Sequence, residues 1–215
     1  MPGGLGCSLL LGRRSAYRED MTHTTDRYPA AELTDLPEDI RARIEEVGQQ
    51  TGFVPNVFIH LARRPAGFRA FFAYYDALME KDTGNLTKAD REMIVTVTSA
   101  ANKCLYCVVA HGVVLRVFEK DPFIADQVAL NYRHADLPAR QTAMLDFAMK
   151  VQQTPWLICD DDFAELAAHG FDDEDAWDIT AITGFFGLSN RMATVTGMAP
   201  NPEFYLMGRV PRDKR

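Results

Sequence analysis

"LTKADREMIVTVTSAANKCLYCVVAHG" (Leu86–Gly112) combines a strong helix start with a compact group of reactive side chains. Thr87 is a good N-cap residue, and Asp90 occupies the third helical position, where an acidic side chain completes a capping box. The tetrapeptide VTVT (Val95–Thr98) alternates as a strand would, but Ser-Ala-Ala-Asn follows it and no hairpin turn flanks it. The stretch therefore predicts a helix rather than a strand.

The remainder of the chain shows helical periodicity interrupted by proline, glycine and acidic residues. Pro37, for example, fits a first helical position, and Gly52 closes the same segment. A further helix is expected to begin near Cys104. We also predict helices at residues 65–81, 122–131, 138–153, 161–169 and 172–198. The predicted fold class is all-α.

The composition is that of an ordinary globular protein. The 215 residues are 47% hydrophobic and 25% charged, with a net charge of −7. This balance predicts no attraction to nucleic acid or to an anionic membrane, and no apolar run approaches the roughly 20 residues that span a bilayer. We expect a cytoplasmic protein. Residues 1–20 are rich in glycine and predict a flexible extension, and residues 21–215 predict a single domain.

Two of the four cysteines, Cys104 and Cys107, are three positions apart, and His111 follows four positions later. At about 100° per residue, a helix places all three side chains on one face. Cα atoms three positions apart lie about 5 Å from each other, within the roughly 4.4–6.8 Å range that a disulfide needs. The pair can therefore close and open without backbone movement. Unpaired N–H groups at the helix start, together with Lys103, would lower the pKa of the Cys104 thiol.

Glu92 completes the candidate site. His111 is near enough to Cys107 to take or return its proton, and an acid aimed at the imidazole would orient it. In one unbroken helix, Glu92 would lie about 120° away from the cysteine face. It reaches the site only if the chain bends near Asn102. We therefore expect a bend there, with Glu92 on the preceding helix.

The spacing Glu-x11-Cys-x2-Cys-x3-His, formed by Glu92, Cys104, Cys107 and His111, resembles the active-site signature of the alkylhydroperoxidase AhpD family, within the carboxymuconolactone decarboxylase-like superfamily. The segments TGFVPNVF, LTKADREMI and FFGLSNRMA are similar to its peroxidase-related branch, and the likeness runs from about residue 26 to residue 208. The resemblance implies an AhpD-like helical bundle, reduction of hydroperoxides through the cysteine pair, and homo-oligomers.

One position departs from the family pattern. AhpD carries a histidine immediately before the second cysteine, where this chain has Tyr106. A tyrosine hydroxyl donates a hydrogen bond but does not titrate near neutral pH, which affects the proton relay, the rate and the preferred substrate. Decarboxylase members of the superfamily lack the cysteine pair, so decarboxylation is not expected.

These residues predict a thiol-dependent peroxidase with Glu92 and His111 as its proton relay, and with no cofactor or metal. Peroxide oxidises one thiolate to a sulfenic acid, the second thiol condenses with it, and a dithiol or thioredoxin-like reductant restores the pair. We favour Cys107 as the attacking sulfur because His111 is its i+4 neighbour. Cys104 is then the resolving sulfur and is expected to be the more exposed one. The order found in thioredoxin-like proteins, where the N-terminal cysteine attacks, favours the reverse.

Three other interpretations stay open. A zinc site could use Cys104, Cys107 and His111 with Glu92 as the fourth ligand, although structural zinc usually takes further ligands from a distant segment. The cysteines could instead be small buried core residues beside a structural histidine. The pair could also serve a disulfide reductase or a redox-sensing helical oligomer without peroxidase turnover.

Two segments of the chain, 85 residues apart, show a weak internal sequence similarity, called here the internal echo. It pairs the candidate N-caps Thr87 and Asp172, but sets Cys104 opposite Ser189. The pattern predicts an internal duplication in which the second copy keeps packing and loses the chemistry. The motif-bearing half is about residues 86–120, and the degenerate half is about residues 171–198.

Two further groups have structural interpretations. Aromatic residues at positions 68, 71, 72, 74 and 75 predict core and oligomer contacts, with some lining an entry for an organic peroxide. Asn190 and Arg191 interrupt an otherwise apolar stretch, and they predict an anchor for the second half or for an interface.

Overall fold

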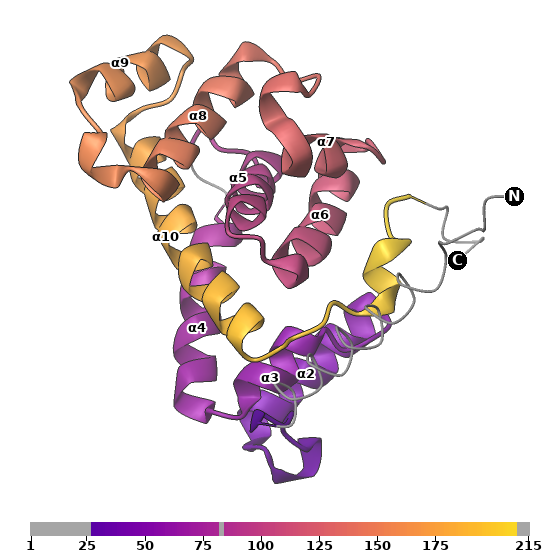
Figure 1. The fold of residues 1–215 in the computed structure, drawn as a ribbon. Helices are drawn as coiled ribbons and strands as arrows, with labels where there is room; N and C mark the ends of the chain where they lie inside the picture. The colour runs from indigo at the N-terminus through magenta and orange to yellow at the C-terminus, as the bar shows by residue number, and fades with distance from the viewer. Residues whose placement is uncertain (1–26, 82–83, 210–215) are drawn as a thin grey trace, which may run out of the picture.

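The computed structural model describes residues 27–81 and 84–209, which fold into α-helices joined by short turns (Figure 1). No strand occurs within these two ranges, so the predicted all-α fold is confirmed. The predicted extension at residues 1–20, and its boundary with a single domain at residue 21, lie outside the described residues.

Nine α-helices occur in the described ranges. Their bounds are α2 (Glu38–Thr51), α3 (Asn56–Ala62), α4 (Pro65–Met79), α5 (Lys88–Ala101), α6 (Leu105–Glu119), α7 (Ile124–Asn131), α8 (Ala139–Gln153), α9 (Asp160–Ala168) and α10 (Asp173–Val195). Short 3-10 turns occur at η1 (Leu33–Asp35), η2 (Tyr132–His134), η3 (Pro155–Leu157) and η4 (Pro202–Tyr205).

Every helix predicted from the sequence is present, with its ends shifted by at most a few residues. The sequence does not predict α3, because its seven residues are too few to show a periodic pattern and its N-cap, Pro55, makes no side-chain cap hydrogen bond. The capping box between Thr87 and Asp90 is confirmed at the start of α5.

α5 is the central helix, and α6, α7, α8 and α10 pack around it (Figure 1). All residues from Ala89 to Ser99 are buried. Every face of α5 is therefore covered, including the side that carries its buried charged and hydroxyl residues. The hydroxyls of Thr96 and Thr98 donate to the carbonyl oxygens of Glu92 and Ile94 at 2.8 and 2.7 Å, which satisfies these polar groups inside the core.

The buried charges of α5 pair with charges from later helices. Arg91 is fully buried and donates to Asp178 of α10 at 3.0 Å, and Lys81 donates to the same carboxylate at 2.9 Å. Asp90 accepts from Arg140 of α8 at 2.9 Å. Because an ion removed from water needs a partner, these pairs fix the positions of α8 and α10 against the central helix.

α2, α3 and α4 form a separate layer at the opposite end of the molecule from α8 and α9 (Figure 1). This layer has its own apolar cluster, which includes Ile40, Ile44, Phe68 and Phe72. α4 connects the layer to the rest of the fold through contacts with α10. The core role predicted for the aromatic residues is confirmed for Phe68 and Phe72, whereas Tyr74 is exposed.

The two halves of the internal echo share a helix start but not a turn. Thr87 and Asp172 both accept a hydrogen bond as N-caps in capping boxes. α10 then continues unbroken for 23 residues, whereas a turn separates α5 from α6. The internal duplication stays a prediction.

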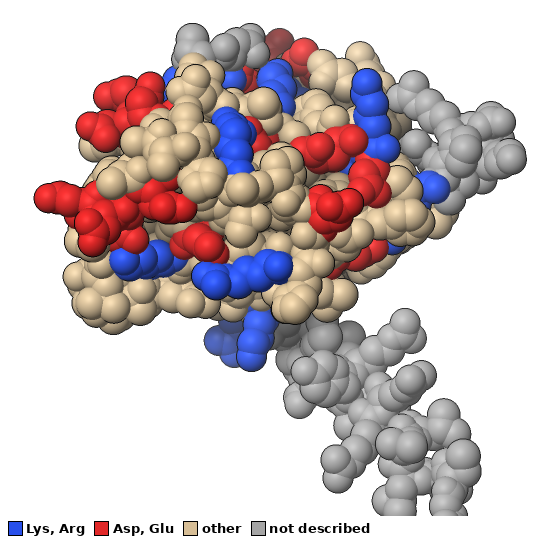
Figure 2. Space-filling view, turned by 90° about the horizontal axis from the view of Figure 1, so that it is seen from above, with Lys and Arg blue, Asp and Glu red and all other residues tan. Residues whose placement is uncertain are grey.

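Within the described ranges, no helix is both long enough and apolar enough to span a membrane. Figure 2 shows the face seen from above, where Lys and Arg side chains are scattered among acidic and uncharged ones. No broad basic area occurs on this face.

We expect Asp178→Ala to lower the free energy of unfolding by about 3 kcal/mol or more, because it removes the carboxylate that the buried Arg91 shares with Lys81. Urea unfolding followed by circular dichroism measures this loss. Asp126→Ala is the matched control, because Asp126 pairs with Arg209 at the surface and its loss should cost about 1 kcal/mol or less. Equal losses in the two variants would contradict a core role for Asp178.

Candidate active site

The candidate residues lie on both sides of the turn between α5 and α6. Asn102 ends α5, Lys103 has a left-handed φ of 55°, and Cys104 is the N-cap of α6. The N–H of Cys104 donates to the carbonyl of Ser99 at 3.0 Å, and that of Lys103 donates to the carbonyl of Ala100 at 2.9 Å. This is the hydrogen-bond pattern of a Schellman motif. The predicted bend near Asn102 is confirmed.

Side chains from α8 and α10 hold this turn in place. The Asn102 amide donates to Oδ1 of Asn190 at 2.8 Å, and its own oxygen accepts from Gln152 at 2.7 Å. The Asn190 amide donates to the Ser99 hydroxyl at 2.9 Å. Asn190 is therefore an anchor, as predicted. Arg191 is exposed and donates to a carbonyl one turn earlier in its own helix.

His111 and Glu92 are in direct contact. Nδ1 of His111 lies 2.7 Å from Oε2 of Glu92, and their side chains are 14% and 5% exposed. Because a carboxylate accepts hydrogen bonds, Nδ1 carries the proton and Nε2 is left for another partner. The edge-to-face contact with Phe186, at 4.7 Å between ring centres, also holds the imidazole. The bend thus brings Glu92 to His111 from the preceding helix.

Cys104 and Cys107 are both reduced and buried, each with 1% of its surface exposed. A hydrogen bond from the Cys107 thiol lowers the pKa of Cys104 to about 6. The Thr194 hydroxyl and the backbone N–H groups of Cys107 and Tyr106 also lower the pKa of Cys104. The hydrogen bond with Cys104, and burial, raise the pKa of Cys107. The two shifts run in opposite directions, so Cys104 is the more acidic sulfur of the pair.

Cys107 lines a pocket, whereas Cys104 does not. The pocket has a volume of about 760 Å³ and lies between the α2–α4 layer and the helices α6 and α10. Tyr106 and His111 also line it, as does Ser189, whose Oγ is 3.7 Å from the Cys107 sulfur. Residues at the rim, such as Glu46, are exposed. Cys107 thus lies at the inner end of a path from solvent.

Cys104 and Cys107 are equally exposed, so the expectation that Cys104 is the more exposed cysteine is not confirmed. Cys104 belongs to a buried cluster with Ala193 and Met198, and the Thr194 hydroxyl of α10 hydrogen-bonds to its sulfur, so this N-cap residue is covered by the fold. Lys103 is also expected from the sequence to lower the pKa of Cys104. Its side chain is exposed, and it is not among the main causes of the lowered pKa.

Tyr106 connects α6 to the layer formed by α2, α3 and α4. Its hydroxyl accepts a hydrogen bond from the N–H of Val57, in α3, at 3.1 Å. Burial raises the pKa of Tyr106, so the hydroxyl stays protonated at neutral pH. Burial and the charge of Glu92 likewise raise the pKa of Tyr75, which lines the same pocket. Both tyrosines can donate hydrogen bonds, but neither can exchange protons as a histidine would.

Two neighbours of the sulfur pair are not among the candidate site residues predicted from the sequence. Ser189 and Thr194 both come from α10, and Ser189 lies 82 residues beyond Cys107. Ser189 lies within FFGLSNRMA, one of the segments that resemble the peroxidase-related branch, and the offset of 85 residues sets it opposite Cys104. Packing of α10 against the turn brings these hydroxyls to the sulfurs.

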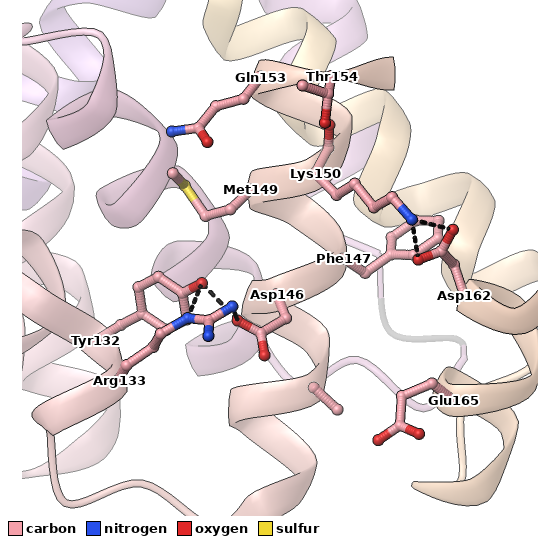
Figure 3. Close-up of a pocket in the computed structure, with 11 residues that line it drawn as sticks. Tyr132, Arg133, Asp146, Phe147, Met149, Lys150, Gln153, Thr154, Asp162 and Glu165 are labelled. Atoms are coloured by element: carbon pink, nitrogen blue, oxygen red, sulfur yellow. Dashed lines mark hydrogen bonds and ion pairs between the residues drawn. The ribbon is translucent and has the colours of Figure 1, made fainter. Parts of the chain in front are cut away.

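A second pocket, of about 500 Å³, lies between η2, α8 and α9 (Figure 3). Its charged side chains pair with one another: Lys150 lies 2.6 Å from Asp162, and Arg133 lies 2.7 Å from Asp146. None of the candidate site residues lines this pocket. Within the described part of the chain, no three His, Cys, Asp or Glu side chains are grouped to hold a metal ion.

The helical fold and the paired thiols beside a Glu–His contact define an AhpD-like protein. The model of the carboxymuconolactone decarboxylase family matches residues 65–151. An uncharacterized peroxidase-related protein from Ralstonia eutropha JMP134, described as an alkylhydroperoxidase AhpD core, is 66% identical with a TM-score of 0.84, over 86% of this chain and 97% of that chain. The chain therefore belongs to the AhpD-like family of the carboxymuconolactone decarboxylase-like superfamily.

More distant relatives share the fold. A peroxidase-related protein from Silicibacter sp. TM1040 is 41% identical with a TM-score of 0.79, over 85% of this chain and 94% of that chain. The debrominase Bmp8, in complex with 2,3,4-tribromopyrrole, is 19% identical with a TM-score of 0.66, over 84% of this chain and 94% of that chain. At that identity the likeness shows the fold alone. No curated protein matches the chain.

We expect a thiolate to form in the cysteine pair with a midpoint near pH 6, because the hydrogen bond from Cys107 stabilises the charged form of Cys104. The thiolate is present above this pH and is lost as the pH falls through it. Ultraviolet thiolate absorbance measures the midpoint in a variant that lacks Cys7 and Cys159. Cys107→Ala removes the donor and should raise the midpoint towards that of an ordinary thiol. An unchanged midpoint would contradict this origin.

Proposed function

We propose that the protein is a thiol-dependent peroxidase that reduces hydroperoxides through Cys104 and Cys107, with His111 and Glu92 as proton relay. The contact between His111 and Glu92 carries the proposal, because it joins a proton-transfer pair to a pocket that ends at a sulfur. Family membership supports the proposal, since the relative that is 66% identical is named a peroxidase-related protein.

Cys107 is the attacking sulfur in this proposal. The lower pKa belongs to Cys104, but the sulfur that lines the pocket is the one that can meet the substrate. The Cys107 proton moves to the Cys104 thiolate along the hydrogen bond that joins them, which leaves Cys107 as the thiolate. An S–O bond then forms as the O–O bond breaks, and the departing alkoxide takes a proton that comes from solvent and is relayed through Nε2 of His111, while Glu92 holds the Nδ1 proton. The products are a Cys107 sulfenic acid and an alcohol.

Cys104 is the resolving sulfur. Its thiol attacks the sulfenic sulfur, an S–S bond forms, and water leaves. The two sulfurs already share a hydrogen bond, so this step requires little movement. A dithiol or thioredoxin-like reductant then attacks the disulfide, supplies two electrons and two protons, and becomes a disulfide itself.

The proposal includes a cytoplasmic homo-oligomer. A reducing compartment supplies the dithiol that the cycle needs. Exposed apolar side chains follow one face of α10, including Trp177, Leu188 and Val195. Their spacing sets them within about 20° of one another around the helix, and contiguous exposed apolar surface marks protein contacts.

The same face of α10 supports a second candidate function, a redox-sensing oligomer in which disulfide formation changes assembly. The two candidates differ in turnover. Peroxide-dependent oxidation of a dithiol, measured together with oligomer size, separates them. Repeated turnover supports the peroxidase, and a change of size without turnover supports the sensor.

We expect one equivalent of hydroperoxide to remove two of the four thiols of the reduced protein, because one disulfide forms between Cys104 and Cys107. A thiol count before and after treatment measures the loss, and dithiothreitol should restore both thiols. Cys159→Ser is the matched control and should still lose two thiols. Cys104→Ser should not lose two. Reversible loss of two thiols in Cys104→Ser would contradict the proposed pair.

Trapping of the sulfenic acid distinguishes the two cysteine roles. We expect a dimedone adduct in Cys104→Ser, which keeps Cys107 at the pocket, and none in Cys107→Ser. Mass spectrometry of the treated variants locates the adduct. If the adduct forms in Cys107→Ser alone, the low pKa of Cys104 outweighs access and the roles are reversed.

A further inference from the structure

The pocket that ends at Cys107 has an aromatic interior. Phe58 and Phe72 stack with their ring centres 4.3 Å apart, and Phe186 is buried against His111. Phe71 and Tyr75 continue this lining. A volume of about 760 Å³ is in the range of sites that hold whole organic molecules, far beyond what hydrogen peroxide fills. The lining therefore favours a substrate with a sizeable apolar body.

The outer part of the pocket carries more acidic than basic side chains. Its ionisable lining residues there are Asp39, Glu46, Asp76, Glu80 and one cation, Arg43. Cations outside the lining hold two of the acids: Arg69 lies 2.7 Å from Asp39, and Lys88 lies 3.3 Å from Glu80. These pairs bring the rim close to charge balance without an excess of positive charge.

Arg43 is already engaged within the pocket. Its two terminal nitrogens donate to both oxygens of Asp76, at 2.9 and 2.7 Å, and its guanidinium lies 4.8 Å from the centre of the Phe72 ring. His111, at the inner end, is held by Glu92. A carboxylate that entered the pocket would have to displace Asp76 or remain unpaired beside several acids. An unpaired carboxylate against apolar side chains is costly.

We propose that this pocket selects uncharged organic hydroperoxides with an aromatic or branched apolar body and discriminates against those that carry a carboxylate, such as free fatty-acid hydroperoxides. The choice of a hydroperoxide as the substrate rests on the proposed peroxidase function. The preference for an uncharged substrate rests on the lining of the pocket alone. The apolar body packs on the phenylalanine lining, and the peroxide end reaches Cys107 and His111. Arg43 is the one Lys or Arg among the described residues that line the pocket, and its bidentate pair with Asp76 leaves an anionic substrate without a cation to pair with.

Cumene hydroperoxide bearing a para-carboxylate, compared with its methyl ester, changes the charge on one scaffold. In the dithiol-coupled assay we expect kcat/KM for the ester to exceed that for the acid by at least about ten-fold. Equal values, or a preference for the acid, would overturn the inference and leave the peroxidase function standing. Absence of turnover with both would count against the peroxidase function, and binding then decides the charge preference.

Binding is measured without any peroxide, using methyl 4-isopropylbenzoate and 4-isopropylbenzoate in titration calorimetry of the reduced wild-type protein. The ester should bind at least about ten-fold more tightly than the acid. Equal binding, or tighter binding of the acid, would overturn the inference whatever the turnover.

Asp76→Asn tests the role of the ion pair between Arg43 and Asp76. It weakens that pair and removes one acidic side chain from the pocket. We expect the ratio of ester to acid affinity to fall by about ten-fold in this variant. Asp126→Asn is the matched control: Asp126 also forms a bidentate pair, with Arg209 at 2.7 Å for both contacts, but does not line the pocket. Equal changes in both variants would show an effect of net charge and overturn selection by the pocket.

Discussion

The turn at Lys103 is the constraint on which the site depends. A continuous helix would point Glu92 about 120° away from the sulfurs. The Schellman turn instead ends α5, begins α6 at Cys104, and lets the carboxylate meet His111 across two adjacent helices. The left-handed φ at Lys103 costs a non-glycine residue about 1–2 kcal/mol. Hydrogen bonds to Asn102 from the side chains around it offset that cost.

The more acidic sulfur of the pair is not the one that lines the pocket. The helix start and a donated hydrogen bond favour the thiolate on Cys104, while the pocket opens to Cys107. In the proposed mechanism the proton shared between the two sulfurs connects these properties, because its transfer moves the negative charge from Cys104 to the sulfur that lines the pocket. Burial of both sulfurs also protects the thiolate from water and from reagents that the pocket does not admit.

The pocket lies where the layer of α2, α3 and α4 meets the helices α6 and α10. α2, α3 and α4 supply its aromatic wall, and the hydrogen bond from Val57 to Tyr106 ties that wall to α6. On the other side, the buried ion pair of Arg91 with Asp178 fixes α10, which carries Ser189 to the Cys107 sulfur. Interactions of the central helix therefore position Glu92, the aromatic wall of the pocket and the neighbours of the sulfurs together.

The sequence by itself determined the helical fold, the capping box at Thr87, the bend near Asn102 and the grouping of Glu92 with His111, because each depends on residues within about twenty positions. The tertiary structure decided which sulfur lines the pocket and which is covered. Those properties depend on α10 and on the N-terminal layer, whose residues lie far along the chain and share no motif with the cysteines. Burial is a property of packing between such distant segments, so the position of Cys104 at a helix start could not predict how exposed it is relative to Cys107.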